Sequence, residues 1–187
     1  MQHVLKTAIP FAATLILSAC GNNSNPENKA GAAHSHDHAA MEQVQTATTA
    51  NPVLKNDKLN AVYQHYIHLT TALTNGDVAE AKIAANAIEA GSKSINGASG
   101  IASSAEKIMA APDMAAQRTS YSGMSKDIAE LIKKEGLSGG ELYVAFCPMA
   151  LNDKGATWIS GSREIRNPYF GEKMLTIPKG MDPAQFL

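Results

Sequence analysis

Cysteine is scarce in this sequence, with only Cys20 and Cys147 among 187 residues, so a disulfide framework is excluded. An excess of charge of one sign is also lacking, because 16 Lys and Arg stand against 17 Asp and Glu. Nothing in this balance points to a nucleic-acid partner. No glycine-rich loop followed by a lysine is present, which excludes the common phosphate-binding loop. No enzymatic turnover is expected.

The first residues follow the pattern of an exported lipoprotein. Lys6 precedes an apolar run from Ala8 to Leu17, and small residues stand directly before Cys20. The run is too short to cross the roughly 30 Å hydrocarbon core of a bilayer as a helix. Met1–Ala19 is therefore predicted to be a signal peptide that is removed, and lipid on Cys20 is predicted to anchor the mature chain to a membrane.

The predicted location is the cell envelope, on the outer membrane or a periplasmic face rather than in the cytoplasm. Once Cys20 carries lipid, Cys147 is the single remaining thiol and no internal disulfide can form. The alternative is an ordinary signal peptide that is cleaved near Ala19, with Cys20 as a bystander.

Residues 20–53 are predicted to form a disordered tether, because this segment has almost no large apolar residue to bury. Within it, His34, His36 and His38 alternate with other residues. Imidazole nitrogen suits Cu(II) and Zn(II), so this tract is a weaker, second candidate metal site. The alternative is a polar spacer whose histidines bind nothing.

Residues 54–187 are predicted to form one mainly α domain. Apolar residues recur every three or four positions in four stretches, a spacing that is typical of amphipathic helices. The four stretches are 54–75, 78–91, 101–109 and 114–134. Asn75-Gly76 is expected to end the first helix, and Asp77, with Glu80 three positions later, is expected to cap the second.

Two short strands are predicted after the fourth helix. Leu142–Phe146 and Ala156–Ser160 have the composition of strands, and Asn152–Gly155 has that of a turn. The expected fold is an up-and-down bundle of about four helices with a small C-terminal β-hairpin and coil cap.

Three sulfur-bearing residues near this hairpin are candidate metal ligands. Cys147, Met149 and Met174 offer a thiol and two thioethers, which are soft ligands that select Cu(I). Pro148 fixes the backbone between the first two sulfurs, which favours a preformed site. The alternative is that these sulfurs only fill the core.

Two histidines, His65 and His68, lie three positions apart on the first predicted helix and could reach a neighbouring element. The alternative is that both are simply solvated or hydrogen-bonded. A nucleophilic pair of Cys147 with His68 is disfavoured, because no third orienting group is marked and the cysteine signatures of papain-type and caspase-type proteases are absent.

Several motifs together resemble a known domain family. In chain order they are Tyr66-Ile67-His68-Leu69, an alanine-rich helix with Ala81, Ala84 and Ala85, Gln117-Arg118, Cys147-Pro148-Met149-Ala150, Trp158-Ile159-Ser160 and Asn167-Pro168-Tyr169-Phe170-Gly171. Over about residues 58–177 the sequence resembles DUF3347, a family of unknown function found in lipoproteins and at the C-termini of heavy-metal efflux adaptor proteins.

The resemblance implies a copper-handling context, with Cys147, Met149, Met174 and His68 at positions where the family places its potential ligands. The sequence departs from the family after Met174, where relatives often continue with Cys-Gly and this chain has Ile177-Pro178. A site with two cysteines is therefore excluded here.

The leading hypothesis is a membrane-anchored, periplasm-facing lipoprotein that binds Cu(I) in metal buffering, delivery or efflux. Its expected partners are the membrane, through the lipid, and a heavy-metal efflux or copper-delivery protein. The alternative is a non-metal interaction module that docks on an envelope partner such as an efflux adaptor, with Asn167–Gly171 as its contact or as a plug of the fold.

Overall fold

The computed structural model describes residues 51–162, 166–174 and 184–185. The predicted signal peptide Met1–Ala19, the predicted lipidation residue Cys20 and the histidines His34, His36 and His38 lie outside the described residues. The elements, in chain order, are β1 (Val53–Leu54), α1 (Asp57–Asn75), α2 (Val78–Ser92), α3 (Ser99–Ala110), α4 (Met114–Glu135), β2 (Leu137–Gly139), β3 (Tyr143–Cys147), α5 (Ala150–Asp153), β4 (Ala156–Ser160), the 3₁₀ helix η1 (Gly171–Met174) and β5 (Ala184–Gln185).

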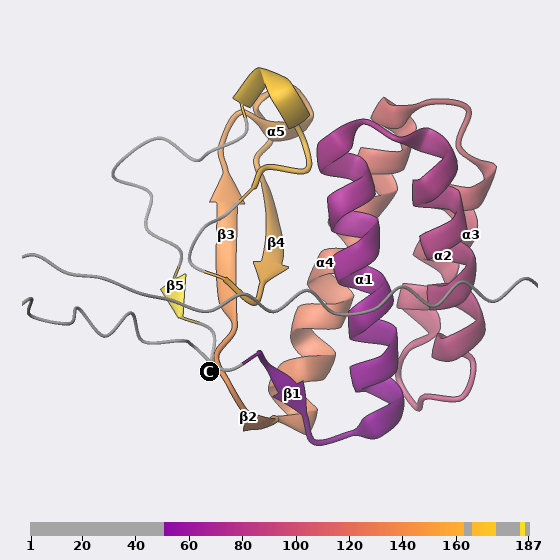
Figure 1. Ribbon diagram of the computed structural model, residues 1–187. Helices are drawn as coiled ribbons and strands as arrows, with labels where there is room; N and C mark the ends of the chain where they lie inside the picture. Colours follow the sequence, from indigo (N-terminus) through magenta and orange to yellow (C-terminus); the bar gives the residue numbers. More distant parts are fainter. Residues whose placement is uncertain (1–50, 163–165, 175–183, 186–187) are drawn as a thin grey trace, which may run out of the picture. The chain divides into compact units, whose positions relative to one another are not determined.

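The helices α1 to α4 form an up-and-down bundle, with the hairpin of β3 and β4 beside it (Figure 1). Each helix packs against the next, and α1 also contacts α4. The apolar stripe predicted for the first helix is buried, and its members are Leu59, Val62, Tyr66, Leu69 and Leu73. The predicted mainly α fold with a C-terminal hairpin is confirmed.

The turn between α1 and α2 has the predicted chemistry. Gly76 ends α1 with φ of 73°, in the left-handed region that glycine adopts without steric cost. The carboxylate of Asp77 then accepts a hydrogen bond of 2.9 Å from the backbone N–H of Glu80 and caps α2. Local signals therefore fix where one helix stops and the next begins.

The strands β3 and β4 pair antiparallel, from Tyr143 opposite Ser160 to Cys147 opposite Ala156. The short β5 pairs with β3 on its other side, which leaves β4 at the edge of this sheet. β4 packs against α4. A separate two-stranded ladder joins β1 to β2, so the first described strand is fastened to the chain just after α4. None of β1, β2 and β5 was predicted.

The turn predicted at Asn152–Gly155 begins earlier in the structure, within α5. Leu151, Asn152 and Asp153 all have positive φ, at 56°, 58° and 60°. Residues with a Cβ rarely adopt this region, and three in succession reverse the chain tightly between β3 and β4. Gly155, also with positive φ, completes the reversal.

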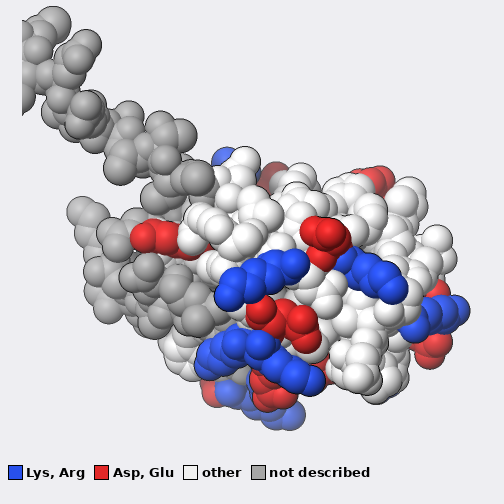
Figure 2. Space-filling view, turned by 90° about the horizontal axis from the view of Figure 1, so that it is seen from below, with Lys and Arg blue, Asp and Glu red and all other residues white. Residues whose placement is uncertain are grey.

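Charges of both signs are mixed on one face of the domain. On the face shown in Figure 2, blue Lys and Arg side chains stand beside red Asp and Glu side chains rather than forming one continuous basic surface. Within the described ranges, no helix combines the length and apolar character needed to cross a membrane.

Candidate functional site

The thiol of Cys147 is buried at the end of β3. Side chains two positions apart along a strand share a face, so Cys147 lies on the same face as Tyr143 and Ala145, which are both buried. Only 3% of Cys147 is exposed, and its thiol is free. The predicted strand ended at Phe146, whereas the observed strand β3 includes Cys147 as its last residue.

Asn167 supplies the polar contact of this thiol. Its Nδ2 donates to the Sγ of Cys147 over 3.4 Å, and its Oδ1 accepts a bond of 2.9 Å from the backbone N–H of Tyr169. The second bond orients the amide, because the oxygen must face Tyr169 and the nitrogen must then face the sulfur. The buried sulfur is thus held next to an N–H donor that would stabilise a thiolate.

Arg118, on α4, fixes the segment that carries Asn167. Its Nε donates to the carbonyl of Pro168 over 2.7 Å, and its second terminal nitrogen donates to the carbonyl of Leu73 over 2.9 Å. One guanidinium therefore ties the segment before η1 to the end of α1. Burial lowers the pKa of Arg118 from its ordinary value, but an arginine remains charged at physiological pH.

Gly171 lets this segment approach α1 closely. It has φ of 58°, and a Cβ at this position would lie 2.7 Å from the backbone oxygen of Thr74. Contacts this short do not occur for real Cβ atoms, so the approach of η1 to α1 requires glycine.

Aromatic rings pack around Tyr169, which follows Asn167 by two residues. The ring of Tyr169 packs against Trp158 and Tyr121, with centroids 5.8 Å and 5.7 Å away, and its hydroxyl donates to the carbonyl of Thr157. Burial raises the pKa of Tyr169 above its ordinary value, and the neighbouring Tyr66 and Cys147 raise it further. The Tyr169 hydroxyl therefore stays neutral at physiological pH.

Met149 stands two residues beyond Cys147, at the surface. Its residue is 41% exposed, and it lines a shallow hollow together with Arg118, Leu151, Tyr169 and Phe170. Cys147 and Met149 thus both adjoin the segment 167–170, one from inside the domain and one from its surface. Met174 is the last residue of η1, which continues this segment, and its side chain lies outside the described part.

His68 is directed elsewhere. Its Nε2 lies 2.8 Å from a carboxylate oxygen of Glu80 on α2, and nearly half of its side chain is exposed. His65, on the same helix, is exposed. The structure therefore brings Cys147 and Met149 to one segment, and it brings His68 to Glu80.

The described part of the chain holds no group of three His, Cys, Asp or Glu side chains that could bind a metal ion. Thioether sulfur, as in Met149, is the further donor that stands near Cys147 along the chain. Such a donor set, one thiolate with thioethers, suits Cu(I) and is poor for harder ions.

Two residues of this site were not assigned a role from the sequence. Asn167 and Arg118 both lie in motifs that carried the family resemblance, but those motifs do not say that one touches the thiol and the other holds the segment. The signal that could have pointed to Asn167 is the run Asn167-Pro168-Tyr169-Phe170-Gly171, whose turn residues follow the hairpin without any apolar periodicity.

The described residues form a helical bundle with a C-terminal hairpin, and this hairpin carries a buried free thiol. Residues 62–140 match the family model "Protein of unknown function (DUF3347)", which confirms the predicted resemblance over this range. The matched range includes His68 and Arg118 and ends before β3, so Cys147 and Met149 lie beyond it. No similar curated protein and no similar solved structure were found.

Proposed function

We propose that this chain is a membrane-anchored lipoprotein, facing the periplasm, that binds Cu(I) in copper buffering, delivery or efflux. The observation that carries the proposal is the pair of sulfurs at the end of β3. The thiol of Cys147 is buried against the amide of Asn167, and Met149, two residues on, is exposed at the hollow beside it. Soft sulfur ligands of this kind select Cu(I).

Each ligand has a distinct role in this proposal. The thiolate of Cys147 supplies most of the affinity, and the N–H of Asn167 stabilises its charge. Met149 receives the ion at the surface, and Met174, on the same segment as Asn167, is the third ligand. His68 is the candidate fourth ligand, and its ligation requires that its pair with Glu80 opens.

The remaining parts of the proposal concern the N-terminal segment and the partners. Lipid on Cys20 holds the protein to a membrane, and His34, His36 and His38 form a weaker second site for Cu(II) or Zn(II). The partner is a heavy-metal efflux or copper-delivery protein, with neither nucleic acid nor catalytic turnover involved. The balance of 16 Lys and Arg against 17 Asp and Glu supports a partner other than nucleic acid.

The test is an anaerobic Cu(I) titration of the full-length chain in detergent, against a competing chelator. Cys147→Ser is expected to weaken Cu(I) binding by orders of magnitude, and Met149→Leu or Met174→Leu by less. Met109→Leu, at a half-buried position on α3, is the matched control and is expected to bind as the wild type does. Leucine replaces methionine in a core for less than about 1.5 kcal/mol, so the comparison reports ligation. Equal Cu(I) affinity of the wild type and Cys147→Ser would end the copper proposal.

The second candidate function is a non-metal interaction module that docks on an envelope partner such as an efflux adaptor. It is favoured by the exposed apolar residues at this end of the hairpin, since Phe146 is 49% and Met149 is 41% exposed. These two side chains offer apolar surface to a protein partner. This function would stand if Cu(I) binding proved independent of Cys147.

A further inference from the structure

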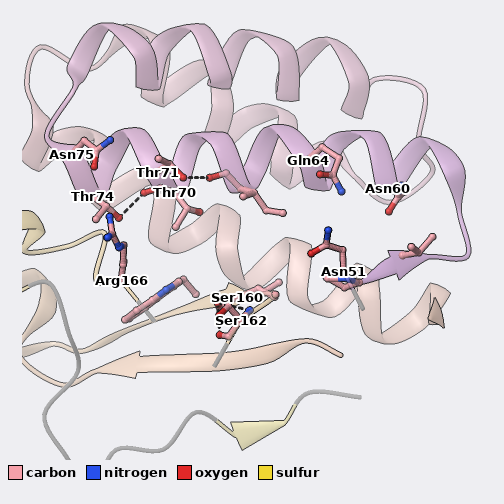
Figure 3. Close-up of a pocket in the computed structure, with 16 residues that line it drawn as sticks. Asn51, Asn60, Gln64, Thr70, Thr71, Thr74, Asn75, Ser160, Ser162 and Arg166 are labelled. Atoms are coloured by element: carbon pink, nitrogen blue, oxygen red, sulfur yellow. Dashed lines mark hydrogen bonds between the residues drawn. The ribbon is translucent and has the colours of Figure 1, made fainter. Parts of the chain in front are cut away.

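A groove of about 590 Å³ runs between α1 and the end of β4, and residues 51–53 contribute to it as well (Figure 3). On its α1 side the lining residues recur every three or four positions, which is the spacing of one helix face. Asn60, Gln64, Ile67, Thr71 and Thr74 follow this spacing, and the adjoining Thr70 and Asn75 also line the groove. From Asn60 to Asn75 the helix rises about 22 Å, the length of about seven residues of extended chain.

In the part of the chain that the structure describes, the polar lining of this groove is almost uncharged. Gln64 and Asn51 are exposed amides, and each offers both a donor and an acceptor, as a peptide group does. Thr71 donates its hydroxyl to the carbonyl of Ile67 over 3.0 Å, so this hydroxyl is left with acceptor lone pairs. Such a lining complements the N–H and C=O groups of an uncharged backbone better than it complements an ion.

Apolar contacts are available in the same groove. Val53 is 47% exposed and Ile67 is 38% exposed, and both line it. A peptide with apolar side chains would cover these two residues, which a small hydrophilic molecule would leave in water.

The positive charge of Arg166 makes the two ends of the groove different. Among the described residues, Arg166 is the single charged one in the lining, and it lies beside Thr74 and Asn75 at one end, with Asn60 and Asn51 toward the other end (Figure 3). A guanidinium binds a carboxylate with good geometry. The ligand should therefore carry a carboxylate at the Arg166 end.

The edge of β4 contributes surface to this groove, but it does not accept a complete added strand. The backbone N–H of Ile159 donates to the hydroxyl of Tyr66 over 3.1 Å, so this edge donor is already used. Side chains of α1, rather than a continued β-ladder, must hold an extended ligand.

We propose that the groove between α1 and β4 binds an extended, mainly uncharged peptide segment of a partner protein, about seven residues long, with a carboxylate against Arg166 and apolar side chains against Val53 and Ile67. This binding requires neither Cys147 nor a metal ion.

The test is fluorescence anisotropy of the full-length chain with two labelled, amidated heptapeptides of alternating valine and serine, one ending in aspartate and one in lysine. The aspartate peptide is expected to bind at least about tenfold more tightly, a difference of about 1.4 kcal/mol. Arg166→Glu is expected to invert this preference.

Two exposed isoleucines on neighbouring helices provide a test variant in the groove and a matched control outside it. Ile67→Glu should weaken the aspartate peptide at least about tenfold, whereas Ile83→Glu, on α2 and 61% exposed outside the groove, should leave its binding unchanged. Equal binding of the two peptides, equal effects of the two substitutions or no binding of either peptide would overturn the proposal.

Discussion

The side-chain amide of Asn167 and the thiol of Cys147 form one buried pair, in which Nδ2 donates to Sγ over 3.4 Å. The two residues belong to different segments, since Cys147 ends β3 and Asn167 precedes η1. Their contact therefore joins the strand that carries the thiol to the segment that closes over it.

Replacing Asn167 by leucine tests whether this amide supports both the fold and the thiolate. Asn167→Leu removes the donor to Cys147 and leaves the backbone N–H of Tyr169 without its acceptor. The free energy of unfolding in urea is expected to fall by about 1–3 kcal/mol. Cu(I) affinity is expected to fall less than in Cys147→Ser. Asn96→Leu, in the exposed loop between α2 and α3, is the control. An Asn167→Leu protein with wild-type stability and wild-type Cu(I) affinity would contradict both roles.

The buried hydroxyls of Tyr66 and Tyr63 predict opposite outcomes for the same chemical change. Tyr66 bonds Ser125, Tyr121 and the backbone N–H of Ile159, whereas the buried hydroxyl of Tyr63 has no partner within the described residues. Tyr66→Phe is expected to cost about 1–3 kcal/mol, because it orphans buried groups, while Tyr63→Phe is expected to be neutral or stabilising. Urea unfolding of both variants measures the difference. Equal losses of stability would show that the Tyr66 network does not matter.

Two glycines provide a matched pair for the approach of η1 to α1. Gly171→Ala would place a methyl group against the backbone oxygen of Thr74 at positive φ, whereas nothing lies within 4 Å of a Cβ at Gly139. The first variant is expected to lose about 1–3 kcal/mol of stability, and the second to stay within about 0.5 kcal/mol of the wild type. Chemical denaturation curves provide the comparison. A Gly171→Ala protein as stable as Gly139→Ala would mean that the contact relaxes freely.

The lipid anchor is tested at Cys20. Cys20→Ser is expected to give unprocessed or soluble protein, because the acyl chains are the proposed anchor. Fractionation of cells into membrane and soluble material, followed by immunoblotting, measures this directly. Membrane association that survives the substitution would contradict the lipoprotein assignment.

The sequence predicted the features that local chemistry determines. Gly76 and Asp77 mark the junction of α1 and α2, and the structure shows the left-handed glycine and the capped N-terminus expected there. The hairpin strands were predicted within one residue at each end, because their strand-like composition and the turn residues between them are local signals. These signals lie within a few residues of the feature that they specify.

Features that depend on distant pairing were not predicted. β1 is two residues long and pairs with β2 more than 80 positions later, so no periodicity within either segment could reveal it. The partner of His68 is likewise on another helix, and the spacing of residues in α1 cannot say that Glu80 faces it. The contact of Asn167 with Cys147 could not be predicted either, because it depends on the path of the chain from β3 to η1.

The β1–β2 ladder is also the first part of the domain that a force applied at Asn51 would reach. Val53 and Leu54 are fastened to Gly139 and Leu137, and the next backbone N–H, that of Lys55, donates to the carbonyl of Gly136 over 3.1 Å. This ladder lies at the end of the bundle opposite to α5 and to the end of β3 (Figure 1). A pull exerted through Asn51 would therefore act first on the β1–β2 ladder and the start of α1, at the end of the bundle away from the thiol of Cys147.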